Sequence, residues 1–237
     1  MIEFLLKSPA VIKAVSKGEN FRMKRIIDLS HDIVHQMPVF PADPPVGILN
    51  HHSHKNMGYC VSQVIMGTHT GTHVDVPLHK FECGDSVDKI PLENFTGKAV
   101  IIDLTFLRNG EEIERKHLEE HEDNIKMCKI VILKTNWAKH FGMDDFFTGF
   151  SGISEEAAKW LSRKDIRMVA VESPSVHATK HEKVHEYFLE KGIIILETLN
   201  NVDKIEAMFV ELYAVPLKFK GLDGSPVRAF AIEDQDE

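Results

Sequence analysis

The chain has 237 residues, of which 43% are hydrophobic and 27% charged, a composition typical of a folded globular protein that buries a sizeable core. Its formal net charge of −8 argues against a broad surface for nucleic acid or anionic membranes, so we predict partners of neither class. Histidine is unusually frequent, with 14 residues. Because histidine is the commonest metal ligand and titrates near neutral pH, its positions in the chain are informative.

The N-terminal segment, residues 1–22, contains apolar runs that Lys7 and Pro9 interrupt. These runs are too short and too broken for a signal peptide or a membrane-spanning segment. Pro9 at the start and a glycine past the end predict a short helix here. Met23 could equally be a natural start, which would make this segment an appended extension. No repeat or Gly/Ser linker interrupts the rest, so we predict that residues 23–237 form a single domain.

Most of the remaining chain consists of short apolar runs separated by loops. Runs of strand length lie at residues 26–29, 99–104, 130–134, 167–171, 193–196 and 210–215, and the longer segment 59–77 is predicted to be extended because it is rich in β-branched residues and threonine. One helix is predicted from Ser154, a hydroxyl cap, to about Arg163, and another from a capping box that opens at Thr179 to Gly192. Strands outnumber helices, so we predict an α/β or α+β fold with a mixed or barrel-like β-sheet and flanking helices.

The three cysteines, Cys60, Cys83 and Cys128, are far apart in the sequence and form no CxxC pair. This spacing indicates neither a disulfide framework nor a thiolate zinc site. Unpaired cysteines fit a reducing compartment, and we therefore predict a cytoplasmic protein.

The densest chemical patch is residues 68–79, which reads THTGTHVDVPLH. His69, His73, Asp75 and His79 are all odd-numbered, so in an extended chain their side chains face the same side. Two imidazoles and a carboxylate form a ligand set that leaves a position open to water. We therefore predict a metal site in this patch.

The spacing also predicts a bend in the patch. In a straight strand, His69 and His73 would lie about 13 Å apart. Zinc holds each histidine nitrogen at about 2.0–2.1 Å, so both can bind one ion only if the chain turns between them. Gly71 is the residue that permits such a turn, whereas His73 and Asp75 converge with little distortion.

Other histidines lack this arrangement. We predict that the cluster His51, His52 and His54 lies in a solvated loop. Five more stand among charged or loop residues and are assigned no chemistry: His31, His35, His117, His121 and His140.

The patch resembles the HxGTHxDxPxH signature of the metal-dependent cyclase and kynurenine formamidase (arylformamidase) family. The resemblance extends over nearly the whole chain from Lys24. Residues 27–44 resemble the opening segment of the family, residues 133–137 its KTGW segment with Asn136 in place of glycine, and residues 172–176 its DTPSI segment with Glu172 in place of aspartate. Both replacements stand near the place where such enzymes hold substrate.

The resemblance implies a swivelling β/β/α architecture, a homo-oligomer (dimer or tetramer) and a hydrolase with one or two divalent metal ions, zinc first and manganese as the alternative. By motif, His69, His73 and Asp75 would hold the first ion, and His79 would act as the acid/base. A second site in such enzymes uses a later histidine and glutamate twelve residues apart, which His185 and Glu197 match, with the aspartate bridging. His181 is one helical turn from His185 and is the rival ligand. Without the family spacing, Glu197 would be a surface acid at a strand end.

The predicted substrate is a small molecule with an aromatic or cyclic amide. The preferred reaction is hydrolysis of an N-formyl aryl amine, such as N-formylkynurenine, to formate and the free amine. Opening of a cyclic amide, or metal binding without catalysis, stays open. A serine or cysteine nucleophile is less favoured, because no GxSxG-type elbow is present. Five residues are candidates for an aromatic pocket, although core packing is the preferred role for most of them: Phe40, Tyr59, Trp137, Phe146 and Phe147.

Overall fold

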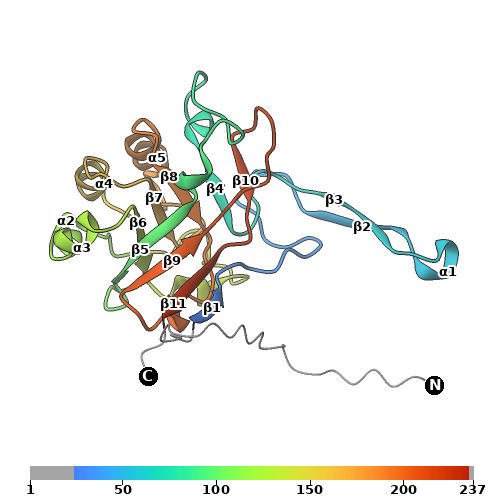
Figure 1. Cartoon of the computed structure of the whole chain (residues 1–237), viewed down its shortest axis with the longest axis horizontal. Helices are drawn as coiled ribbons and strands as arrows, with labels where there is room; N and C mark the ends of the chain where they lie inside the picture. The colour runs from blue at the N-terminus through green and yellow to red at the C-terminus, as the bar shows by residue number, and fades with distance from the viewer. Residues whose placement is uncertain (1–23, 235–237) are drawn as a thin grey trace, which may run out of the picture.

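The computed structural model describes residues 24–234, so the short helix predicted within residues 1–22 lies outside the described residues. A mixed sheet forms the body, helices cover one of its faces, and a long hairpin extends away from it (Figure 1). No helix in the described part of the chain is long and apolar enough to cross a membrane.

The sheet has nine strands in the order β1-β11-β9-β5-β6-β7-β8-β4-β10. Their bounds are β1 (Lys24–Asp28), β4 (His73–Asp75), β5 (Thr96–Asp103), β6 (Ile130–Lys134), β7 (Met168–Val171), β8 (Ile194–Glu197), β9 (Phe209–Tyr213), β10 (Gly224–Pro226) and β11 (Phe230–Asp234). Strands β5 to β8 are parallel, and the other neighbours are antiparallel. The predicted mixed sheet with flanking helices is confirmed, while the swivelling β/β/α assignment stays a prediction.

The parallel strands require crossover connections, and these carry the helices. The helices are α2 (Arg115–Glu119), α3 (Glu122–Lys126), α4 (Glu155–Leu161) and α5 (His181–Leu189), and the short 3-10 turns are η1 (Pro77–His79), η2 (Leu92–Asn94), η3 (Trp137–His140) and η4 (Val202–Lys204). Helix α4 begins as predicted, because the Ser154 hydroxyl accepts a hydrogen bond from the Ala157 N–H at 3.2 Å.

The start of α5 differs from the prediction. Thr179 does not cap this helix, whose N-cap is Lys180 without a side-chain hydrogen bond. The buried His177 instead holds the turn before the helix, since its Nδ1 accepts the backbone N–H groups of Thr179 and Lys180 at 3.1 and 3.0 Å. The capping-box prediction is therefore wrong.

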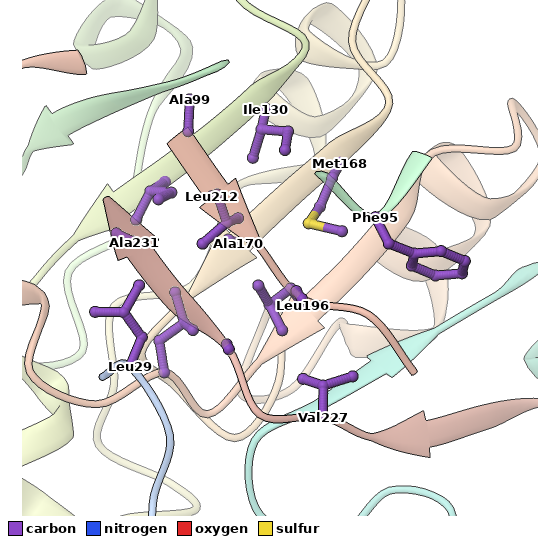
Figure 2. Packing of buried hydrophobic residues seen from close by; sticks show 14 of the residues in the cluster. Leu29, Phe95, Ala99, Ile130, Met168, Ala170, Leu196, Leu212, Val227 and Ala231 are labelled. Atoms are coloured by element: carbon purple, nitrogen blue, oxygen red, sulfur yellow. The ribbon is translucent and has the colours of Figure 1, made fainter. Parts of the chain in front are cut away.

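The core has two parts, one on each face of the sheet. Successive side chains of a strand point to opposite faces, so Val100 and Ile102 pack under the helices while Ala99 and Ile101 pack on the other face. Figure 2 shows this second face, where Met168, Leu196 and other buried side chains from neighbouring strands meet. Burial on both faces explains the continuous apolar runs of the central strands.

A hairpin of β2 (Gly47–His52) and β3 (Val61–Ile65), with the short helix α1 (His54–Met57) at its tip, forms an arm that leaves the body (Figure 1). Every side chain of β3 is exposed. The solvated loop predicted around His51 is thus a strand followed by a helix, although His51 and His54 are exposed and His52 is half-buried. The strand pairing was missed because the arm has no buried face to produce an apolar alternation.

Candidate metal centre

Two neighbouring strands supply the buried centre of the site. His73 and Asp75 are the first and last residues of β4, so both side chains face the same side. Antiparallel pairing sets Glu197, the last residue of β8, directly opposite His73. The three residues are only 4%, 1% and 3% exposed. The register of two short strands therefore brings one imidazole and two carboxylates together.

The predicted bend at Gly71 is confirmed. Gly71 has a φ of 60°, in the left-handed region. The turn brings His69 back toward the strand, so the ring centroids of His69 and His73 lie 5.1 Å apart. In a straight strand the two residues would be about 13 Å apart. Nδ1 of His69 is 2.7 Å from Asp75 Oδ1.

Helix α5 supplies the third imidazole. Nε2 of His185 lies 3.3 Å from Asp75 Oδ2 and 3.3 Å from Glu197 Oε1. The His181 ring, one turn earlier, lies 6.5 Å from the His185 ring and instead meets the edge of Phe40. Of the two rival histidines, His185 is the one whose nitrogen faces the carboxylates.

Each of these imidazoles has one nitrogen bound to an outer acceptor. Nδ1 of His73 donates to the Gly71 carbonyl at 2.8 Å, and Nδ1 of His185 donates to the His181 carbonyl at 2.7 Å. Nε2 of His69 donates to Asp223 Oδ2 at 2.7 Å. The other nitrogen of each ring faces Asp75 or Glu197, which is the arrangement that metal-binding histidines almost always adopt.

Two buried oxygens test whether the residues fit a metal. Asp75 Oδ2 and Glu197 Oε1 have no hydrogen-bond partner of good geometry. An unpaired buried carboxylate oxygen raises the free energy of the folded state, because it has lost its hydrogen bonds to water without forming others. A divalent cation among these oxygens and the facing imidazole nitrogens would satisfy them. The donor set therefore fits a metal such as zinc, which binds nitrogen and carboxylate oxygen.

The electrostatic field at the site favours positive charge. Burial alone would lower the pKa of His69, but the carboxylates of Asp75 and Asp223 raise it to about 11. Burial likewise opposes a charged His185, yet Asp75 and Glu197 raise its pKa to about 10. Burial opposes ionisation of Asp75, but the neighbouring imidazoles hold its pKa well below the usual range. Metal binding here would displace imidazole protons, as it does in most histidine sites.

His79 lies at the rim of the site. It ends the turn η1, its side chain is 34% exposed, and its ring lies 4.1 Å from the His69 ring and 5.6 Å from the His185 ring. A ring nitrogen of His79 is also within 4.8 Å of ligand atoms of Asp75 and His185. The structure thus brings together all six residues named from the sequence, with His79 the most open to solvent.

Asp223 is a site residue that the sequence patterns did not reveal. It precedes β10, which pairs with β4 so that Gly224 lies opposite Asp75. Hydrogen bonds from His69 and His79 hold the pKa of the Asp223 carboxyl well below its usual value. Its Asp-Gly sequence is a common turn signal, and only the pairing of β10 with β4 could have placed it here.

A cavity of about 300 Å³ opens beside these residues. Its other wall is apolar and is formed by Pro38, Val39, Phe40, Pro41, Phe141, Phe146, Phe147 and Pro174. Of the predicted aromatic candidates, Phe40, Phe146 and Phe147 line the cavity, and Phe141 was missed. Tyr59 is exposed on the arm, and the buried Trp137 donates from Nε1 to the Phe146 carbonyl. These two residues therefore do not form the wall.

The two replacements in the family segments lie outside the cavity lining. Asn136 has a φ of 61°, a left-handed conformation that glycine adopts freely and asparagine tolerates. Glu172 is buried and accepts hydrogen bonds from the N–H and hydroxyl of Thr135 at 2.6 and 3.2 Å, while burial raises its pKa. Neither side chain lines the cavity, so any effect of these replacements on substrate choice is indirect.

Comparison with known proteins identifies the family. The family described as "Putative cyclase" matches residues 27–178. The chain belongs to this family. Kynurenine formamidase of Bordetella avium (strain 197N) is 32% identical to it over 212 residues, which cover 87% of this chain and 97% of the relative. The family resemblance drawn from the histidine motif is confirmed.

Two solved structures have a similar fold. Isatin hydrolase A from Labrenzia aggregata, bound to benzyl benzoate, superposes with a TM-score of 0.80 at 26% identity and covers 90% of this chain and 94% of its own. A structure described as a potential metal-dependent hydrolase with cyclase activity has a TM-score of 0.75 at 25% identity and covers 91% of this chain and 100% of its own.

Proposed function

We propose that this protein is a metal-dependent hydrolase that cleaves the amide bond of an N-formyl aryl amine, N-formylkynurenine or a close relative, to formate and the free amine. One observation carries the proposal: three imidazoles and two carboxylates meet at one side of a cavity whose other side is aromatic. The kynurenine formamidase relatives support the choice of an aryl formamide.

The metal would be held by residues already brought together. His69, His73 and Asp75 would bind the first ion, and Asp75 would share a second with His185 and Glu197. We propose zinc, with manganese as the alternative. A divalent ion bound here would activate a water near neutral pH and polarise the substrate carbonyl.

His79 is proposed to move the proton. Its ring borders the cavity and is the most open of the site imidazoles. It would accept the proton of the attacking water and return it to the amide nitrogen, which leaves readily only when protonated. The oxygen of the water then becomes part of formate, and its proton becomes part of the amine.

The aromatic wall is proposed to bind the aryl group. Phe146 and Phe147 meet edge to face with ring centroids 5.0 Å apart, and Phe40 meets Phe147 in the same way at 6.0 Å. Rings in this arrangement present edges and faces to a further ring, which would pack among them and exclude water from the amide.

The decisive experiment is a substrate panel on the zinc- and manganese-loaded protein. We expect release of formate from N-formylkynurenine and from formanilide. Turnover of isatin alone would instead support the cyclic-amide reaction, as named for the similar isatin hydrolases. Bound metal with no turnover of any compound would contradict the proposed hydrolysis and favour a non-catalytic role.

Asp43 gives a second prediction, on substrate choice. It is the one charged residue lining the cavity outside the candidate ligands, and no lysine or arginine is among the described lining residues. N-formylkynurenine carries an ammonium group that Asp43 would attract, whereas formanilide carries none. We expect Asp43→Asn to raise KM for N-formylkynurenine roughly 2- to 5-fold, the size of a solvent-accessible ion pair, and to leave KM for formanilide unchanged.

Steady-state kinetics with the two substrates check this, and the exposed Asp32→Asn on the same loop is the matched control. An equal rise of KM for both substrates would contradict a role for Asp43 in binding the ammonium group.

We also propose a homo-oligomer in which the arm packs on a second copy of the chain. A two-stranded hairpin alone is marginally stable in water, and Leu49, Val64 and Ile65 on this arm are each about half exposed. We expect Val64→Lys/Ile65→Lys to convert the oligomer to monomer in light scattering. The control Leu92→Lys, at a 65% exposed position on the body, should keep the native mass. A monomeric wild type would contradict the proposal.

Two further assignments complete the proposal. Residues 23–237 would act as one hydrolase domain, and the protein would work in the cytoplasm, as its unpaired cysteines suggest.

A further inference from the structure

One carboxylate oxygen of Asp223 lies within reach of two imidazoles of the site. Oδ2 is 2.7 Å from Nε2 of His69 and 3.3 Å from Nδ1 of His79. The other oxygen, Oδ1, accepts a hydrogen bond from the Thr68 hydroxyl at 3.0 Å. Both oxygens are therefore engaged, and the carboxylate has one preferred orientation.

The fold holds this carboxylate close to β4. The Asp223 carbonyl accepts a hydrogen bond from the Val76 N–H, and the next residue, Gly224, pairs with Asp75. A Cβ on Gly224 would come within 2.7 Å of the Val74 carbonyl oxygen and 3.0 Å of His69 Cε1, so the backbone approaches as closely as only glycine allows. Asp223 is thus fixed relative to the two imidazoles.

We propose that Asp223 is a positioning residue that orients the His79 ring and, with it, the His69 ring. Among the described residues, Asp223 is the only hydrogen-bond partner of the His79 ring. An imidazole that donates from Nδ1 keeps its lone pair on Nε2. Asp223 therefore leaves Nε2 of His79 as the atom that exchanges protons in the cavity. This consequence rests on the proposed hydrolysis, but the orientation itself does not.

Asp223 also contacts the candidate ligand His69. With Nε2 donating to Asp223, Nδ1 of His69 is the nitrogen that faces Asp75, and it is the atom available to a metal. Outer acceptors of this kind raise metal affinity, and their loss typically costs about 10- to 100-fold. One side chain would thus set the orientation of both a ligand and the acid/base.

The test compares Asp223→Ala with wild type in three measurements. We expect kcat for N-formylkynurenine to fall about 10- to 100-fold while KM changes less than about twofold, because the cavity walls are untouched. We expect zinc affinity, measured by competition with a chromophoric chelator, to fall about 10-fold. Histidine nitrogen NMR spectra of the zinc-loaded protein should show the proton of His79 on Nδ1 in wild type and a mixture of tautomers in the variant.

Asp88→Ala is the matched control. Asp88 accepts the Gly221 N–H at 2.8 Å and so anchors the same loop without touching a histidine. We expect wild-type kcat, zinc affinity and His79 tautomer. An equal loss of kcat in Asp88→Ala, or unchanged kcat in Asp223→Ala, would overturn the proposal. If wild type turns over no formamide, the proposed function fails alone, and the positioning role is then overturned only by an unchanged His79 tautomer and zinc affinity.

Discussion

Replacing Asp75 by asparagine is expected to remove bound metal and to lower kcat/KM by roughly 1,000-fold or more, since hydrolysis would lose both its ion and the activated water. Asp75 is 1% exposed, and its two oxygens face nitrogens of His69, His73 and His185. Asparagine has the same shape but carries no charge, and its amide group would point N–H donors at one of these nitrogens. No other residue of the site contacts all three imidazoles.

Metal content by mass spectrometry and formate release measure this effect, and circular dichroism confirms that the variant folds. Asp103→Asn, an exposed acid at the end of β5, serves as the control and should behave as wild type. Full metal content in Asp75→Asn would show that the ion is held elsewhere.

Replacing His79 by alanine is expected to lower kcat by about 100- to 10,000-fold, the usual contribution of a positioned general acid–base. Metal content should stay normal, because the five buried or half-buried candidate ligands remain in place. The combination of normal metal and lost turnover separates proton transfer from ligation.

His121→Ala provides the control, since this histidine is the N-cap residue of α3 and does not line the cavity. Normal turnover in His79→Ala would remove His79 from the mechanism. A loss of metal in proportion to activity would make it a ligand instead.

The local part of the site was predictable from the sequence. Residues two apart on a strand share a face, and Gly71 supplies the turn that brings His69 back, so three residues and the bend follow from spacing alone. His185 and Glu197 are distant in the chain, and only the resemblance to a family indicated that helix α5 and strand β8 bring them to Asp75.

The parts that were missed depend on contacts between distant segments. Asp223 reaches the site through the pairing of β10 with β4. Sequence patterns do not predict this pairing, because β10 is only three residues long and contains glycine and proline. Phe141 reaches the cavity from a loop after η3, and the arm pairs two strands that bury nothing. Hydrophobic periodicity arises from burial, so it does not predict the structure of a segment that is exposed or lies in a loop.

The strand β4 that carries His73 and Asp75 is three residues long, and its neighbour β10 is the three-residue edge of the sheet. Short edge segments have few backbone hydrogen bonds to break, so they open at lower free energy than the central strands. Glu197 and His185, in contrast, belong to the fully buried β8 and to a helix packed on it. A bound ion would therefore link the short strand β4, near the sheet edge, to β8 and α5, which we expect to open at higher free energy. If the ion is bound as proposed, we expect its release to require fraying of this sheet edge, so the rate of metal loss to a chelator would report how often the edge opens.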